Sequence, residues 1–222
     1  MKLAHYLLND PISWEKININ TLVIENSKQY RDFLMELYRQ SLGETGNFVL
    51  SHDLEIFNIQ KSVEFIESII GVNAENNKKI LTAITKELTE IAINDYNAEV
   101  MQAYNALNRL ISDLIFNSGR DLLFDEINDI SQLLKLYNIR PDFDNLSLAE
   151  KVLLYMELCE KYLKKTLFVF LNLHSYFSDQ ELELIFKSFV YKGHKALIIE
   201  RYDVKASKLE NKRIIDKDLC EI

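Results

Sequence analysis

The sequence predicts an α/β protein in which a mostly parallel sheet is interrupted by an inserted, extended α-helical leg. Continuous apolar runs that suit buried strands lie near both ends of the chain, and each is followed by a segment with helical spacing. Between these two regions, about 70 residues carry helical periodicity and no convincing strand signal. We therefore expect residues 1–61 and 148–222 to form one α/β head, with residues 62–147 inserted as the leg.

The first part of the head is predicted to be a strand, a helix and a second strand. The run "TLVIE" at 21–25 is followed by helical spacing over residues 27–40, for which Ser27 is a suitable N-cap. The turn residues "GETGN" at 43–47 then lead into the short apolar run "FVL".

The leg is predicted to consist of successive helices. A helix over 61–71 ends in glycine, which favours helix C-termini. Apolar residues then keep a helical period over 80–91 and again over 100–115. A further helix is expected over 121–137, ending before Pro141 because the residue that precedes a proline is disfavoured in a helix.

The second part of the head restores the alternation of helices and strands. Ser147 and Glu150 have the spacing of a capping box and open a helix. The strand "TLFVFLNL" at 166–173 follows, then a helix that starts at Ser178, then the strand "KALIIE" at 195–200.

The composition indicates a folded, soluble protein. The chain has 222 residues, 48% of them hydrophobic and 27% charged, with only 5 Gly and 2 Pro. The apolar patch at the N-terminus is too short for a signal peptide, and no run approaches the ~20 apolar residues of a membrane helix. Cys159 and Cys220 lack the spacing of a metal site, so we expect two buried thiols and a cytoplasmic location.

The net charge of −8 argues at first against nucleic-acid binding, which normally needs a basic surface. However, residues 62–150 hold 7 basic and 15 acidic side chains, whereas the rest of the chain holds 19 of each. A neutral head can still concentrate lysines on one face, so the total charge decides little.

The residues give no sign of catalysis. The first strand is followed by "ENSKQY", which lacks the glycines and the GxxxxGK[ST] pattern of a phosphate-binding loop. Asn172 stands at a strand end where an acidic residue would hold magnesium in a nucleotide-hydrolysing enzyme. The four histidines, including His174, have no partner at metal-binding spacing, and no GxSxG motif occurs. We expect no catalytic residue and no enzyme.

An acidic cluster is a candidate metal site. Asp121, Asp125 and Asp129 are spaced four apart and would project from one face of a helix, with Glu126 beside them. A cation would relieve their repulsion, and oxygen ligands favour calcium. Alternatively, these residues are the acidic first turn that the helix macrodipole favours.

Lysines are the candidates for DNA contact, although most charge runs are simply solvated surface. They flank the predicted strands of the head. The candidates are Lys28, Lys164, Lys165, Lys192 and Lys195.

Several stretches resemble one family, the small CRISPR-associated accessory protein of type II-A systems that acts in spacer acquisition (the Csn-two family). They are "LLNDPI", "TLVIENS", "DLLFDEI", "EKYLKKTLFVFLNLHSYFS", "KALIIER" and "IIDKD", and they occur in the family's order. Two features depart from the family's pattern: Thr166 stands where relatives can have a third lysine, and Glu200 is followed by Arg201 instead of proline.

The resemblance implies a degenerate P-loop-like head without a working nucleotide site, and a non-catalytic homotetrameric ring that encircles double-stranded DNA and loads at free ends. It implies that calcium orders the assembly, with Asp121, Asp125 and Glu126 as ligands and Asp129 as a weaker candidate. It also implies that lysines, Lys164 and Lys165 among them, face the DNA, and that the protein assists the CRISPR integrase complex and the type II effector nuclease. The alternative is a degenerate α/β scaffold that joins protein partners and does not itself touch DNA.

Overall fold

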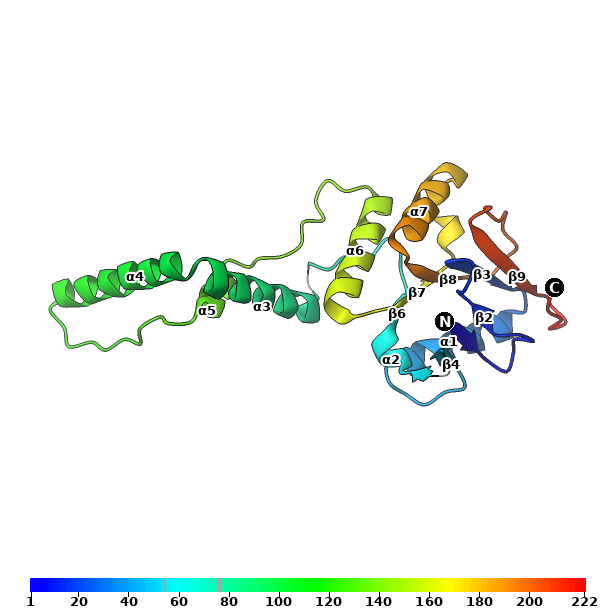
Figure 1. Cartoon of the computed structure of the whole chain (residues 1–222), viewed down its shortest axis with the longest axis horizontal. Helices are drawn as coiled ribbons and strands as arrows, with labels where there is room; N and C mark the ends of the chain where they lie inside the picture. The colour runs from blue at the N-terminus through cyan, green and yellow to red at the C-terminus, as the bar shows by residue number, and fades with distance from the viewer. Residues whose placement is uncertain (54, 76) are drawn as a thin grey trace. The chain divides into compact units, whose positions relative to one another are not determined.

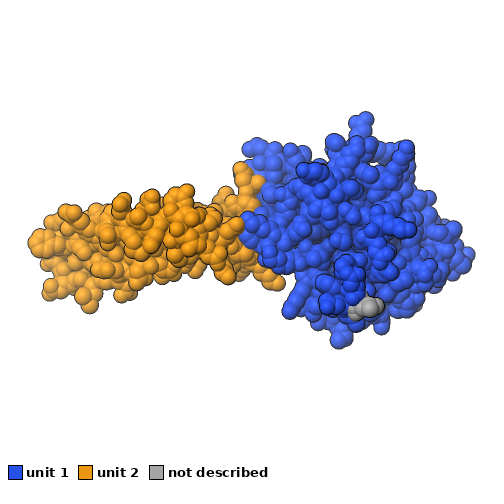
Figure 2. All heavy atoms as spheres, viewed as in Figure 1, with its two compact units in different colours: residues 1–73, 143–222 blue, residues 74–142 orange. Residues whose placement is uncertain are grey.

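The computed structural model describes residues 1–53, 55–75 and 77–222, and Figure 1 shows their helices and strands. They form two compact units (Figure 2). Residues 1–73 and 143–222 form the first unit, the head, and residues 74–142 form the second, the leg.

The head contains a sheet of five parallel strands in the order β6-β7-β8-β3-β9 (Figure 1). The strands are β3 (Ile19–Ile24), β6 (Val63–Ile66), β7 (Leu167–Leu171), β8 (Lys195–Glu200) and β9 (Glu210–Ile215). The continuous apolar runs of β7 and β8 fit a parallel sheet covered on both faces. The predicted α/β class is therefore confirmed, while a kinship with P-loop proteins stays a prediction.

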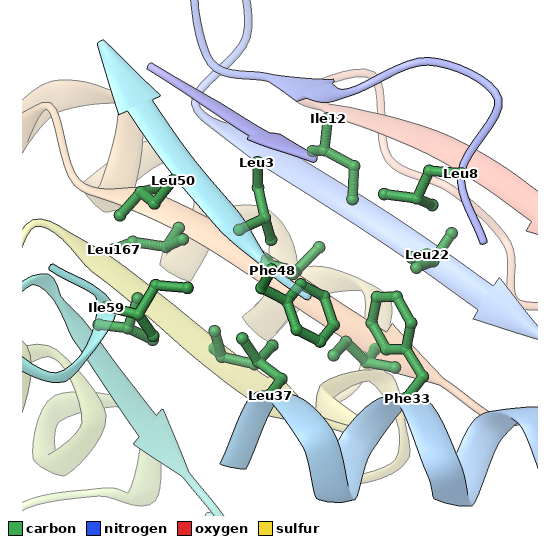
Figure 3. Packing of buried hydrophobic residues seen from close by; sticks show 14 of the residues in the cluster. Leu3, Leu8, Ile12, Leu22, Phe33, Leu37, Phe48, Leu50, Ile59 and Leu167 are labelled. Atoms are coloured by element: carbon green, nitrogen blue, oxygen red, sulfur yellow. The ribbon is translucent and has the colours of Figure 1, made fainter. Parts of the chain in front are cut away.

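Side chains alternate across the sheet, so each strand supplies two cores. On one face, Leu167, Val169 and Leu197 pack in a cluster with Phe33 and Leu37 of α1 (Ser27–Ser41) (Figure 3). On the other face, β7 meets α7 (Asp179–Lys192), where Phe170 stacks on Phe189 with the ring centroids 5.8 Å apart. Helix α6 (Leu148–Leu163) packs beside α7.

A small antiparallel sheet in the order β2-β1-β4-β5 completes the first of these cores. Its strands are β1 (Lys2–Ala4), β2 (Ile12–Ser13), β4 (Val49–His52) and β5 (Glu55–Phe57), and the short helix α2 (Ile59–Ser62) follows them. Leu3, Ile12 and Leu50 of this sheet lie in the same cluster as Phe33 (Figure 3). The small sheet thus covers the α1 side of the head.

The leg is helical but has little core of its own. It consists of α3 (Lys78–Asp95), α4 (Asn97–Ser118) and α5 (Ile130–Leu136), with an irregular segment over 119–129. Among its described residues only Ala74, Ile80 and Tyr104 are buried apolar side chains. No helix in the described part of the chain is long and apolar enough to cross a bilayer.

The predictions of two helices in the leg are wrong, one in its type of structure and one in its extent. Residues 63–66 of the expected helix 61–71 form β6, because backbone pairing with β7 outweighs a local pattern that also fits a helix. The helix expected over 121–137 is limited to α5, so the acidic residues before it lie on irregular backbone.

Two smaller expectations also need correction. The N-cap of α1 is Asn26 and not Ser27, because the Asn26 side chain accepts hydrogen bonds from the backbone N–H groups of Lys28 and Gln29. Cys159 is buried, and burial raises its thiol pKa to about 12, but Cys220 is exposed. The capping box of Ser147 and Glu150 is confirmed.

Candidate functional site

The carboxyl end of β3, where a P-loop enzyme binds phosphate, is filled by the side chain of Arg201. Its guanidinium donates to the Ile24 carbonyl at 3.3 Å and also to the Glu25 carbonyl and the Ser27 hydroxyl. It also lies 6.0 Å from the centre of the Tyr30 ring. These contacts tie the end of β8 to the start of α1.

Asn172, which stands in place of the usual acid, belongs to the same set of contacts. Its amide oxygen accepts from the backbone N–H of Arg201 at 3.2 Å, and its amide nitrogen donates to the Tyr30 hydroxyl at 3.1 Å. Asn172 has a left-handed backbone with φ of 49°, which asparagine tolerates better than most residues. Its role in the described structure is to hold the strand ends together.

Four of the five predicted DNA-contacting lysines come together at the opposite, amino-terminal edge of the sheet. Lys164 and Lys165 lie just before β7. Lys192 ends α7, and Lys195 begins β8. The two strands are parallel neighbours, with Leu167 paired to Lys195, so their starts lie side by side. Lys28, in the first turn of α1 after β3, lies at the carboxyl edge and is separate from this group.

The four lysines of this amino-terminal edge differ in how far their charges are already neutralised. The Lys165 ammonium donates to the carbonyls of Gln60 and Val63 at 2.9 and 2.6 Å and lies 3.5 Å from Glu64. Lys192 is paired with Glu157. Lys164 is exposed and Lys195 half-buried, and no acidic partner for either is found in the described part of the chain. Lys164 and Lys195 are therefore the most available to an external anion.

A buried charged network, which the sequence did not reveal, lies on the α7 side of the sheet. His174 donates through Nδ1 to Glu200 at 2.8 Å and through Nε2 to Glu210 at 3.3 Å. Thr21 also donates to Glu210, as does the backbone N–H of Ser207 at 2.5 Å. The side chains of His174, Glu200 and Glu210 are 7%, 3% and 0% exposed. The partners of His174 lie 26 and 36 positions away, beyond the reach of any short motif.

In this network one imidazole ring lies between two carboxylates. Burial opposes the charge on His174, but hydrogen bonds to Glu200 and Glu210 outweigh it and raise the pKa of His174 to about 9. Burial likewise opposes the charge on Glu210, yet hydrogen bonds from His174, Thr21 and Ser207 lower the pKa of its carboxyl. An imidazolium that donates through both nitrogens has no free lone pair, so His174 is arranged as an internal counter-ion and not as a general base.

The predicted metal ligands are not gathered into a site within one chain. Asp121, Asp125 and Glu126 are exposed on the irregular segment between α4 and α5. Asp129 is the N-cap of α5, and hydrogen bonds from the hydroxyl and backbone N–H of Ser131, both 2.8 Å, lower its pKa. Within residues 1–53, 55–75 and 77–222, no three His, Cys, Asp or Glu side chains are grouped to hold a metal ion. The described acidic side chains of one chain thus do not supply three ligands here, and calcium binding at these residues stays a prediction.

One known family model matches most of the chain. The family model described as CRISPR-associated protein (Cas_Csn2) matches residues 40–219, which include the leg and the four lysines of the amino-terminal edge. The chain belongs to this family.

Membership of the Cas_Csn2 family confirms the resemblance and assigns the chain a role in CRISPR adaptation. The family is an accessory family and is not known to be catalytic.

One prediction separates the structural lysine of this Cas_Csn2 protein from the available ones. Replacing Lys165 with methionine removes the donor for two backbone carbonyls and the partner of Glu64, and we expect it to lower the free energy of unfolding by about 1–3 kcal/mol. Lys164→Met should change it by less than about 0.5 kcal/mol because Lys164 is exposed. Urea unfolding of both variants measures the difference, and equal losses would contradict the assignment.

Proposed function

We propose that this protein binds double-stranded DNA without reading its sequence, as a homotetrameric ring that threads onto free DNA ends during type II-A spacer acquisition. In this proposal it is not an enzyme, and it acts in the cytoplasm beside the CRISPR integrase complex and the type II effector nuclease. Family membership supports the setting, and the chemistry of the head supports the ligand.

The observation that carries the proposal is the group of lysines at the amino-terminal edge of the sheet. Lys164 and Lys195 start neighbouring parallel strands, with Lys192 nearby, so their charges lie on one edge although the chain as a whole is acidic. Ammonium groups arranged in this way suit phosphates, which are spaced regularly along a duplex whatever its sequence. The binding would therefore be salt-dependent and insensitive to base sequence.

The leg supports self-assembly. Large apolar side chains of α4 and of the segment after it are exposed. Exposed apolar surface of this kind is unfavourable in water and often marks a protein–protein contact. They include Met101, Leu107, Leu110, Leu114, Phe116, Leu122 and Leu123. Contact with further copies of the chain would bury such side chains.

Calcium, in this proposal, is bound between copies of the chain. Because one chain does not group three acidic ligands, an ion bound by Asp121, Asp125 or Glu126 would need further oxygen atoms from another chain or from water. Calcium would then favour assembly by joining copies, and its removal by a chelator would weaken the oligomer and DNA binding together.

A second function, an interaction scaffold without direct DNA contact, is favoured by one observation. Lys165 and Lys192 are already paired with acidic side chains, which leaves fewer free charges for phosphates than the sequence suggests. In that case the integrase complex or the effector nuclease would make the DNA contacts.

Mobility shifts on linear and covalently closed circular duplexes of equal length test the proposal. We expect binding to linear DNA that calcium strengthens, that a chelator weakens and that high salt abolishes, with little binding to circles. Equal binding to circles would contradict threading. No binding to either form would favour the scaffold.

A further inference from the structure

The leg contains an open groove between α3 and α5 with a volume of about 790 Å³. Its apolar lining comes from Leu81 on α3, from Leu134 on α5 and from Ile139 just after α5. Both helices belong to the same compact unit, so the groove is a property of the leg alone.

Three threonines on α3 also line the groove, and their hydroxyls add no free donors. The hydroxyls of Thr82, Thr85 and Thr89 donate to the carbonyls four residues earlier at 2.7, 2.8 and 2.7 Å. Because these donors are already satisfied inside the helix, covering the threonines leaves no donor without a partner. The groove is thus suited to apolar contact.

The groove is basic although the leg is acidic. Residues 74–142 hold 11 acidic and 7 basic side chains, yet Lys78, Lys86 and Lys135 line the groove with a single acid, Glu90. Glu90 lies 3.9 Å from Lys86, a distance that gives weak pairing at an exposed site. The occupant that best fits this surface is therefore an apolar segment with negative charges.

The same leg presents such a segment at residues 121–126. Leu123 is fully exposed at 101%, and Leu122 is 52% exposed. Asp121, Asp125 and Glu126 make no ion pair or hydrogen bond with the described part of the chain. The segment is anchored at its end, where the Asn108 side chain binds the backbone N–H and carbonyl of Ile127 at 3.0 and 3.3 Å.

We propose that residues 121–126 of one copy dock into the groove between α3 and α5 of a second copy. Leu122 and Leu123 would supply the apolar contact, and Asp125 and Glu126 would pair with the groove lysines. This inference rests on the self-assembly in the proposed function and names the contact that produces it. Segment and groove are different surfaces of one chain, so the contact is made either reciprocally in a dimer or head-to-tail around a closed ring.

A mixing experiment with charge-reversed chains tests the contact. One variant carries Asp125→Lys and Glu126→Lys, and the other carries Lys78→Glu and Lys86→Glu. All four residues are exposed, so the leg should still fold, as circular dichroism can check. When either variant is studied by itself, its segment and its groove carry charges of the same sign. We therefore expect its self-association to be at least tenfold weaker than that of the natural chain. In a 1:1 mixture every segment meets a groove of opposite charge, and association should return.

Sedimentation velocity measures the association of each variant, of the mixture and of the natural chain. All samples contain a chelator, because lysines in the segment cannot bind calcium and a calcium effect would otherwise be mistaken for a charge effect. Recovery in the mixture supports docking. Failure to recover while the natural chain still assembles overturns the docking inference alone. Assembly of the natural chain only in the presence of calcium also overturns it, because pairing between carboxylates and lysines needs no ion. If the natural chain neither assembles nor binds linear DNA with or without calcium, the proposed function fails as well. Leu123→Ala should also weaken association at least tenfold, whereas Leu136→Ala, an 80% exposed leucine outside the groove lining, should not; equal losses would overturn the docking.

Discussion

Replacing His174 with alanine is expected to lower the free energy of unfolding of the head by about 3–5 kcal/mol, because it leaves two buried carboxylates without their cation. Glu200 and Glu210 are 3% and 0% exposed, and both contact the imidazolium. Urea unfolding at pH 7, followed by circular dichroism, measures the loss.

Two controls separate this charge effect from simple loss of volume. His194→Ala removes another buried imidazole whose partner Glu160 is 55% exposed, so its cost should be smaller. Adding Glu200→Gln and Glu210→Gln to His174→Ala removes the stranded charges and should recover part of the stability. If His174→Ala costs no more than His194→Ala, the buried ion network does not stabilise the head.

The same network predicts the pH dependence. A histidine whose pKa rises from 6.5 to about 9 on folding contributes about 3 kcal/mol at most, fully present below pH 6.5 and lost as the pH rises through 9. Glu210, whose pKa is lowered, contributes stability that is lost as the pH falls below the ordinary glutamate range. The decline on the alkaline side should be absent from the triple variant.

Reversing the charge of Lys164 and Lys195 together is expected to weaken binding to linear duplex DNA at least tenfold while the oligomer stays intact. Each lysine that contacts a phosphate contributes about one unit to the slope of log affinity against log salt, so the slope should fall by about two. Fluorescence anisotropy over a series of salt concentrations measures both quantities, and sedimentation checks the oligomer.

A matched control makes the same charge change elsewhere on the head. Lys187→Glu with Lys217→Glu alters one residue within α7 and one beyond the end of β9, both away from the starts of β7 and β8. We expect a loss of less than about threefold from the change in overall charge alone. If both pairs weaken binding equally, the amino-terminal edge of the sheet is not the contact surface.

The parts of the fold that the sequence predicted are those whose signals are local. Helix α6 follows from the capping box of Ser147 and Glu150, and α7 begins after Ser178, which forms a second capping box with Glu181. Strands β7 and β8 follow from apolar runs too short for a buried helix and bounded by turns. In each case neighbouring residues were sufficient to decide the structure.

The features that could not be predicted depend on distant residues. Strand β6 is defined by pairing with β7, and the ammonium of Lys165 is held by carbonyls 102 and 105 positions earlier. His174 looked isolated because its partners are on β8 and β9. The irregular segment before α5 is held by the side chain of Asn108, which no periodicity can indicate. The acidic residues of this segment could therefore be identified from the sequence, but the irregular backbone that carries them could not be predicted.

The strand order of the head has a consequence for how the chain is made. Strand β3 is synthesised early, but both of its neighbours in the sheet, β8 and β9, come from near the other end of the chain. Strand β6 likewise cannot pair with β7 until the whole leg has been translated. The helices of the leg depend on nearby contacts and can form on the ribosome first, whereas β3 and β6 of the unfinished head remain without their partner strands. During translation the nascent head is thus the part that most needs protection by chaperones.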